Sequence, residues 1–473
     1  MIRLYVLFLN IFLAITLSAQ SAQDSIGFKS DLEIFRKALN ENHPSLYRFT
    51  SESRFEAVYD SLQKSITSKT TPYDFFRVMS KIENLIREGH SYINLSPELS
   101  KLAEQKKILP FKIIVSYGRL IIKESRSASY KKYEGSEIKS INGIEGNKIL
   151  QMIENSTGLK SGFNNSSLMN VLSIENNFAF AYYYFVDPSE VFTIQFKTPQ
   201  GVTMQTISGL QLDTSYKYPL FPAERTPPFN FEILQDRKTA VLKITTFAYW
   251  IVGCDRKQYL NFFNRSFAAI EANHIENLII DVRANRGGDE TVGAELLTYV
   301  AKINFFVFDY IKMKSLNFDY TNSLSSERQH ASIRDYIKTD SGYFRFRDRS
   351  LEEFVIKKKY HFDGKTFVLA NGGSRSAASV FLTLVKTHSI GKIVGHESGG
   401  IFGEVDGYNR ITFTLPYSHF LVSYPIWTLK IIAADENPLR GVMPDYDVEA
   451  TISDLMAGKD SEMDYVMKII KEK

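Results

Sequence analysis

The sequence contains two apolar runs that each break into small, flexible residues: Leu278-Ile-Ile-Asp-Val-Arg-Ala-Asn-Arg-Gly-Gly288 and Thr366-Phe-Val-Leu-Ala-Asn-Gly-Gly-Ser-Arg-Ser-Ala-Ala-Ser379. Such a pattern predicts a buried strand that ends in a turn. A serine at a strand-to-helix turn, here Ser376, can expose its hydroxyl while neighbouring backbone N–H groups face a reacting carbonyl. Either run alone indicates an ordinary turn of an α/β domain.

The sequence from Phe231 to the end alternates strand-like and helix-like patterns. The expected strands are Ala240–Ile244, Leu278–Asp281, Thr366–Leu369 and Lys392–Val394, and the expected helices are Tyr259–Ala272, Thr291–Ala301 and Ala377–Lys386. This alternation predicts βαβ units and an α/β fold.

The two runs resemble the tail-specific (C-terminal processing) serine peptidases, including their tricorn-like branch. In that family a turn ending in Asn-x-Gly-Gly precedes a nucleophile turn Ser-Ala-Ala, as in the runs that end at Gly288 and Ser379 here. The resemblance implies a crotonase/ClpP-like spiral βαβ core over residues 231–473, with Ser376 as the nucleophile. The family often continues Ser-Ala-Ala-Glu, whereas this chain has Ser379. The rival serine, Ser374, does not fit the Gly-x-Ser-x-Gly elbow of the α/β-hydrolases.

A serine needs a base to remove its proton. The processing-protease branch uses a lysine in a Thr-x-Gly-Lys-Gly motif, but the corresponding run Gly395-His-Glu-Ser-Gly-Gly-Ile-Phe-Gly403 has no lysine, and nothing else marks Lys392. The tricorn-like branch uses a histidine that often follows Asp-Gly. This chain reads Glu88-Gly-His90 at that place, so the resemblance implies His90 as the general base, with His396 as the nearest alternative.

The remaining site residues also follow from the resemblance. The family places an acidic residue shortly before a late Gly-Val-x-Pro-Asp motif, which here implies Glu436, or else Asp435, as the carboxylate that orients the histidine. A solvated acidic turn explains these two residues almost equally well. The backbone N–H groups of Ala377 and Gly288 are the implied oxyanion hole.

The N-terminal half predicts four further regions. Arg3 and a short apolar run followed by small residues indicate a signal peptide over residues 1–20. Helical spacing predicts a helical cap region over 24–100. Residues 105–160 resemble the latter half of a PDZ module through Gly135-Ser-Glu-Ile-Lys-Ser-Ile-Asn-Gly143, without a carboxylate-binding loop, so a structural β-module fits nearly as well. A β-rich connecting segment over 161–230 is expected to lead into the core.

The composition and the missing motifs limit which partners and cofactors the protein is expected to bind. The 473 residues carry a net charge of +4, too small to indicate nucleic-acid binding, and the single cysteine, Cys254, has no neighbouring histidine to activate it. Phosphate-loop, zinc-helix and paired-cysteine motifs are missing from the sequence, so no metal or cofactor is expected. We therefore predict an exported, periplasmic or secreted serine endopeptidase that acts on polypeptides, with no transmembrane segment after signal removal. The alternatives are an inactive binding protein on the same scaffold and an esterase or amidase for small acyl groups.

Overall fold

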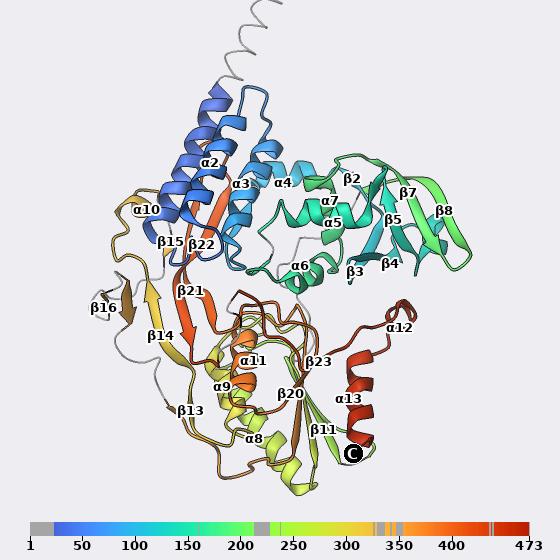
Figure 1. Cartoon of the computed structure of the whole chain (residues 1–473), viewed down its shortest axis with the longest axis vertical. Coiled ribbons are helices and arrows are strands. Elements are labelled where there is room, and N and C mark those ends of the chain that lie inside the picture. The colour runs from blue at the N-terminus through green and yellow to red at the C-terminus, as the bar shows by residue number, and fades with distance from the viewer. Residues whose placement is uncertain are drawn as a thin grey trace, which may run out of the picture.

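The computed structural model of the chain describes residues 23–472, except for 159, 212–227, 237, 325–326, 329–335, 341–342, 347–352, 435–436 and 438. It contains three sheets with hydrophobic cores of their own, and these build the upper and lower parts and the side module seen in Figure 1. The predicted signal peptide lies outside the described residues.

The lower part is an α/β core around a sheet ordered β10-β11-β12-β19-β20-β23. Strands β11 to β23 run parallel, and each pairs with the strand that precedes it in this order, whereas β10 is antiparallel to β11. The strands are β10 (Phe229–Ile233), β11 (Thr239–Ile244), β12 (Asn277–Asp281), β19 (Lys365–Ala370), β20 (Lys392–Gly395) and β23 (Tyr446–Asp447). The predicted strands and the α/β class are confirmed.

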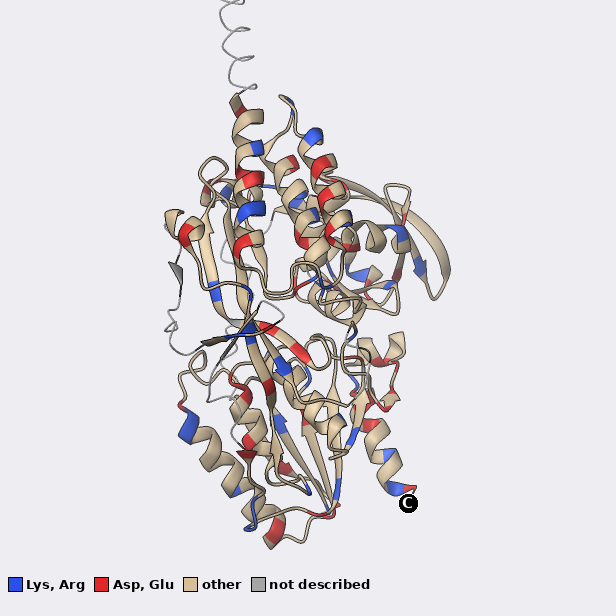
Figure 2. Cartoon of the chain, turned by 60° about the vertical axis from the view of Figure 1, so that its left-hand side comes forward, with Lys and Arg blue, Asp and Glu red and all other residues tan. Residues whose placement is uncertain are grey.

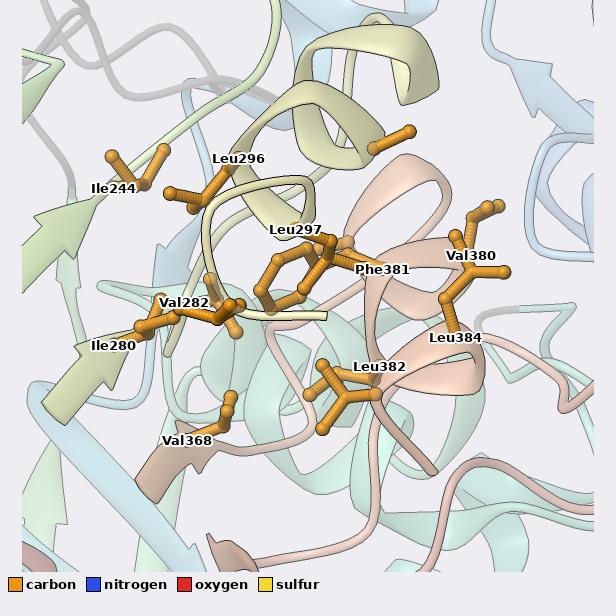
Figure 3. Close-up of a cluster of buried hydrophobic side chains, with 14 of the residues drawn as sticks. Ile244, Ile280, Val282, Leu296, Leu297, Val368, Val380, Phe381, Leu382 and Leu384 are labelled. Atoms are coloured by element: carbon orange, nitrogen blue, oxygen red, sulfur yellow. The ribbon is translucent and has the colours of Figure 1, made fainter. Parts of the chain in front are cut away.

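Helices cover both faces of this sheet. Helices α8 (Arg256–Ala272), α9 (Glu290–Leu297) and α11 (Ala377–Thr387) pack on one face, and α13 (Ser461–Lys471) packs on the other. Figure 3 shows the first face, where side chains of β12 and β19 point toward Leu297 and Phe381. Because parallel strands buried on both faces are apolar throughout, their sequence lacks alternation, as the run Leu278–Ile280 illustrates.

The upper part packs N-terminal helices against a long hairpin of β21 (Glu404–Thr414) and β22 (Leu421–Ile431). The helices are residues 23–42, α2 (Glu52–Ser65), α3 (Pro72–Ile86) and α4 (Pro97–Ala103). The same sheet includes β1 (Tyr92–Asn94), β14 (Phe308–Met313), β15 (Glu327–Arg328), β16 (Tyr336–Lys338) and β17 (Phe344–Phe346), with α10 (Asp319–Ser323) beside it. Lys, Arg, Asp and Glu mix along the N-terminal helices in Figure 2, as expected for solvated helix faces.

The side module comprises residues 107–211, and we call it the β3–β8 module. Its sheet holds β3 (Phe111–Ser116), β4 (Arg119–Ser125), β5 (Glu137–Ile141), β6 (Ile144–Glu145), β7 (Val191–Thr198) and β8 (Gly201–Ser208). Helices α5 (Gly146–Glu154), α6 (Asn165–Leu172) and α7 (Asn177–Phe185) share its core. The sheet and the hydrophobic core of this module therefore extend beyond residue 160, where the sequence predicted the module to end. The predicted connecting segment contains two helices as well as strands.

The free edge of β3 is covered by the module's own chain. The Val115 N–H donates to the Ser173 hydroxyl at 2.9 Å, and Lys112 pairs with Glu175 at 2.6 Å. A peptide that binds by strand addition needs such an edge to be open. A cavity of about 730 Å³ lies farther along the module, between the turns at Gly118 and Gly143, α5 and Met169. Its lining contains none of the candidate site residues.

The remaining elements are short. Strand β2 (Lys107–Ile108) pairs with β9 (Leu210–Gln211), β13 (Phe305–Phe306) pairs with β18 (Glu353–Phe354), and α12 (Ile452–Ala457) precedes α13. A search of the described residues finds no helix with the length and apolar character needed to cross a membrane.

Candidate active site

Ser376 lies where strand β19 turns into helix α11. Hydrogen bonds to the Asn371 side chain stabilise this turn. The Asn371 side-chain oxygen accepts from the N–H groups of Ala284 at 3.0 Å and Gly373 at 2.9 Å. The fully buried Ser374 donates its hydroxyl to the Val282 carbonyl at 2.7 Å. Ser374 thus joins the turn after β19 to the turn after β12. Of the two serines in this turn, Ser376 is only half-buried.

The backbone of Ser376 is strained. Its φ of 52° and ψ of −125° lie in a region that residues with a Cβ rarely adopt, at a cost on the order of 1–3 kcal/mol. Although Ser376 occupies the N-cap position of α11, its side chain makes no capping hydrogen bond. A serine that gives up the usual capping role of its hydroxyl keeps that hydroxyl available for another reaction.

Two backbone N–H groups lie beside this serine. Ala377 is the first residue of α11, whose N-terminal N–H groups have no partner within the helix. A methyl group built on Gly287 would lie 2.7 Å from the Ser376 Cβ and 2.8 Å from the Ala377 nitrogen, so the glycine turn touches the serine directly. The Gly287 N–H donates to Asn285 at 2.9 Å, which leaves the Gly288 N–H as the second candidate donor. No acceptor for Ala377 or Gly288 N–H occurs among the described residues.

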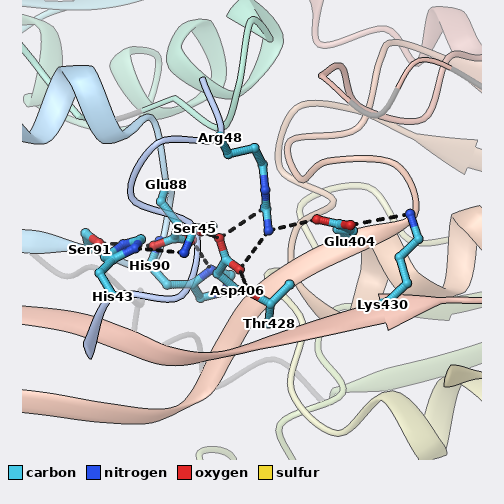
Figure 4. Close-up of polar contacts among 10 residues, drawn as sticks. All are labelled: His43, Ser45, Arg48, Glu88, His90, Ser91, Glu404, Asp406, Thr428 and Lys430. Carbon is cyan, nitrogen blue, oxygen red and sulfur yellow. Dashed lines mark hydrogen bonds and ion pairs between the residues drawn. The ribbon is translucent and has the colours of Figure 1, made fainter. Parts of the chain in front are cut away.

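His90 lies in the tight turn that follows helix α3. Arg87 ends the helix in the left-handed conformation, with φ of 52°, and Glu88 follows it. The His90 Nδ1 lies 2.8 Å from a Glu88 carboxylate oxygen, and the Nε2 faces β21, 4.0 Å from a methyl group built on Gly407. Figure 4 shows the ring and the carboxylate side by side.

The histidine turn and the serine turn meet through their neighbours. A methyl group on Gly89 would lie 2.5 Å from a guanidinium nitrogen of Arg375, the residue before Ser376. No hydrogen bond joins His90 to Ser376 in the described structure. In enzymes without substrate, catalytic hydrogen bonds are often long and shorten only in the reacting complex.

A buried ionic network holds β21 next to His90. Both oxygens of the Asp406 carboxylate accept from Arg48 at 3.1 Å, and the hydroxyls of Ser45 and Thr428 also donate to it. Burial alone would raise the pKa of Asp406, but the positive charge of Arg48 holds it below its ordinary value. The network, drawn in Figure 4, anchors the loop after the first helix to the strand that faces the His90 ring.

His43 is a fully buried member of this cluster. Its Nδ1 accepts from the Ser45 N–H at 3.2 Å, and its Nε2 has no partner among the described residues. Burial lowers its pKa to about 4, so the ring is neutral near pH 7. Nothing in the sequence signals that this loop bonds to Asp406 through Ser45, because the two residues are more than three hundred positions apart.

The alternative base, His396, is engaged elsewhere. Its Nδ1 lies 2.9 Å from Asp447 and 3.2 Å from the hydroxyl of Tyr117, which belongs to the β3–β4 turn. Arg119 on the same hairpin pairs with Glu449 at 2.9 Å. His396 therefore joins the β3–β8 module to the core. Lys392 lies 3.5 Å from Asp445. Asp435 and Glu436, the predicted orienting carboxylates, lie outside the described residues.

Comparison with known proteins relates part of this chain to a protein family. Residues 238–448 match the model of peptidase family S41. No curated protein matches the sequence. The structure of mature CPAF complexed with lactacystin shares the fold, with a TM-score of 0.62 and 14% identity over 94% of this chain and 98% of that one. A crystal structure of a CPAF mutant gives a TM-score of 0.65 and 14% identity over 94% and 97%.

The matched region contains Ser376, Ala377 and Gly288, whereas His90 comes from the N-terminal helices outside it. At 14% identity the CPAF structures support the fold alone. The family model supports the chemistry of the core. Residues 238–448 therefore resemble the core of peptidase family S41, and the chain is a serine-type peptidase.

Proposed function

We propose that the protein is an exported endopeptidase that cleaves polypeptides through an acyl-enzyme on Ser376. The observation that carries this proposal is the strained, uncapped Ser376 in contact with the Gly287-Gly288 turn, where the N–H groups of Ala377 and Gly288 have no acceptor among the described residues. Strain of this kind persists only where surrounding structure imposes it, and it is concentrated at functional sites.

In the proposed reaction, the Ser376 Oγ attacks the peptide carbonyl carbon and its proton passes to the Nε2 of His90. The negative oxygen of the tetrahedral intermediate accepts hydrogen bonds from the N–H groups of Ala377 and Gly288, each contributing about 2.7–4 kcal/mol. The intermediate collapses as the C–N bond breaks and the imidazolium returns its proton to the leaving amine. Water then attacks the ester by the same route, releasing the acid and restoring Ser376.

This proposal requires His90 to reach Ser376 when substrate is bound. The contact between Gly89 and Arg375 supports this, since it already brings the two turns together.

Peptide cleavage tests the proposal. The mature protein and its Ser376→Ala variant are incubated with an unfolded polypeptide, and the products are identified by mass spectrometry. Internal cleavage by the wild type alone, together with an acyl-enzyme mass in acid-quenched samples, is the expected result. Hydrolysis of small esters without peptide cleavage would instead show an esterase, and loss of neither activity in the variant would exclude Ser376.

Export is tested separately. The full sequence is expressed with its own N-terminus in a bacterial host, and the intact mass of the protein in the cell envelope fraction is measured. We expect the loss of about twenty N-terminal residues, as signal peptidase cleavage requires. A full-length mass in the cytoplasmic fraction would contradict it.

A further inference from the structure

Among the described residues, the carboxylate that contacts the His90 ring belongs to its own turn. Glu88 is 4% exposed, and one of its oxygens lies 2.8 Å from the His90 Nδ1. The sequence motif indicated Glu88 only as the residue that replaces a common aspartate, and assigned the orienting role to Glu436.

The hydrogen bonds of Glu88 fix its orientation. Its two oxygens accept from the His90 backbone N–H at 2.9 and 2.8 Å, and one of them accepts from the Ser91 hydroxyl at 3.2 Å. An ionised carboxylate only accepts hydrogen bonds. The proton on the His90 ring must therefore sit on Nδ1, and the lone pair of Nε2 faces away from Glu88.

Glu88 lies near one acidic and one basic side chain. Glu83 lies about one helical turn earlier, and burial, followed by the charge of Glu88, raises the pKa of Glu83 to about 8. Glu83 is thus neutral near pH 7, and Glu88 faces no second anion from this helix. The buried Arg48 lies within electrostatic range of Glu88 and supplies a positive charge.

We infer that Glu88 is the positioning residue that holds His90 in the tautomer required of the base, in place of the expected Glu436. This inference rests on the proposed function of Ser376 and His90. Glu88 would hold the ring through Nδ1 and stabilise the imidazolium that forms when Nε2 takes the serine proton.

The substitution Glu88→Gln tests this directly, because glutamine has the same shape. If its NH2 replaces the oxygen nearest to Nδ1, it donates to Nδ1 and forces the proton onto Nε2. In either place the NH2 opposes the His90 N–H, donor against donor, because both Glu88 oxygens accept from that N–H. Either arrangement removes the hydrogen-bonding pattern seen here.

We expect Glu88→Gln to lower kcat for peptide cleavage on the order of 10²- to 10⁴-fold with KM nearly unchanged. Glu88→Asp, which keeps the charge, should recover most of this loss. Glu137→Gln is the matched control, since Glu137 is also buried but lies in the β3–β8 module and bonds to Lys139. It should keep the wild-type kcat.

A second readout does not depend on activity. In protein labelled with ¹⁵N-histidine, the His90 resonances, assigned with His90→Gln, should show the Nδ1–H tautomer in the wild type and its loss in Glu88→Gln. An Nε2–H tautomer in the wild type would overturn the inference even if Ser376 proved inactive. Unchanged kcat in Glu88→Gln together with a large loss in Glu436→Gln would also overturn it and would return the role to Glu436.

Discussion

Ser376 and Gly287 constrain each other at the point where the two turns of the core meet. The serine has a strained backbone, and the glycine, with φ of 99°, leaves no space for a side chain between its own Cα and the serine. The resulting close approach puts the backbone of Gly287 next to the serine and the start of α11. Glycine is therefore required at position 287 for two reasons: the positive φ of the turn and the close contact with Ser376.

We predict that Gly287→Ala abolishes peptide cleavage. The added methyl group would lie 2.7 Å from the Ser376 Cβ, so the serine turn must shift. A displacement of about 1 Å is enough to cost on the order of 10²-fold in rate. The test compares kcat/KM for peptide cleavage by Gly287→Ala with kcat/KM for the control variant Gly143→Ala.

Gly143→Ala controls for backbone strain alone. Gly143 has φ of 79°, and a methyl group built on it meets nothing within 4 Å. Both variants should lose some stability to thermal unfolding, but only Gly287→Ala should lose activity. Equal activities would show that the contact with Ser376 has no catalytic consequence.

Sequence could predict the residues that belong to short motifs. Ser376, Ala377 and Gly288 lie in turns whose pattern is local, and the structure brings these two turns into contact through Gly287. Glu88 could be seen in the sequence, but its contact with His90 depends on the turn geometry after α3, which no pattern specifies. Asp406 and Arg48 could not be found, because their pairing is a long-range contact between two ordinary-looking segments.

At the scale of elements, the parallel strands and their helices were predictable because each has a strong local pattern. Strand β19 begins one residue before the predicted Thr366, and α11 extends one residue beyond the predicted Lys386. Helix α9 ends at Leu297, earlier than the predicted Ala301. The four residues after Leu297 are buried in the core. The apolar pattern that led to the prediction of a longer helix therefore reflects core packing and not helical structure.

The loop that carries His43 predicts a dependence of stability on pH. The pKa of His43 is about 4 in the folded protein and near 6.5 in an unfolded chain. As pH falls below about 6.5, the unfolded chain binds a proton at His43 that the folded protein does not, so the contribution of His43 to the free energy of unfolding decreases until about pH 4. The full loss is on the order of 3 kcal/mol. Asp406, whose folded pKa is below 3.8, contributes only at lower pH.

The measurement is urea unfolding of the wild type and His43→Gln at a series of pH values. The variant should be less stable near pH 7 but should lose less stability on acidification to about pH 4. Parallel curves for the two proteins would show that His43 is not the group that titrates.

At the scale of the whole molecule, the N-terminal helices and the catalytic core share structure. One hydrophobic core contains Phe28 and Phe75 from the helices together with Phe420 and Tyr424 from the hairpin region. Strand β1 pairs with β22, and Tyr424 donates its hydroxyl to the Ala38 carbonyl at 2.7 Å. His90 is thereby attached to the core through packing that no local sequence pattern could reveal.

We predict that Phe75→Ala destabilises the helices and the active site together. Phe75 is fully buried, and its ring stacks on Phe28 at 4.6 Å and Phe420 at 5.6 Å. Its loss should cost about 3–5 kcal/mol in the free energy of unfolding. Helix content and serine reactivity should be lost at the same urea concentration, as expected for one cooperative unit.

Leu102→Ala is the control for this variant, because Leu102 is 50% exposed on α4. It should leave the unfolding midpoint nearly unchanged. If Phe75→Ala melts the helices while serine reactivity survives to the wild-type midpoint, the helices and the core are independent units and His90 is dispensable.

The central claim is that His90 activates Ser376. The most direct test treats the mature protein with a serine-directed fluorophosphonate and locates the label by peptide mass, beside Ser376→Ala, His90→Ala and His396→Gln. We predict label on Ser376 in the wild type and in His396→Gln, and none in Ser376→Ala or His90→Ala. Label on another residue, or an unchanged rate in His90→Ala, would contradict the account.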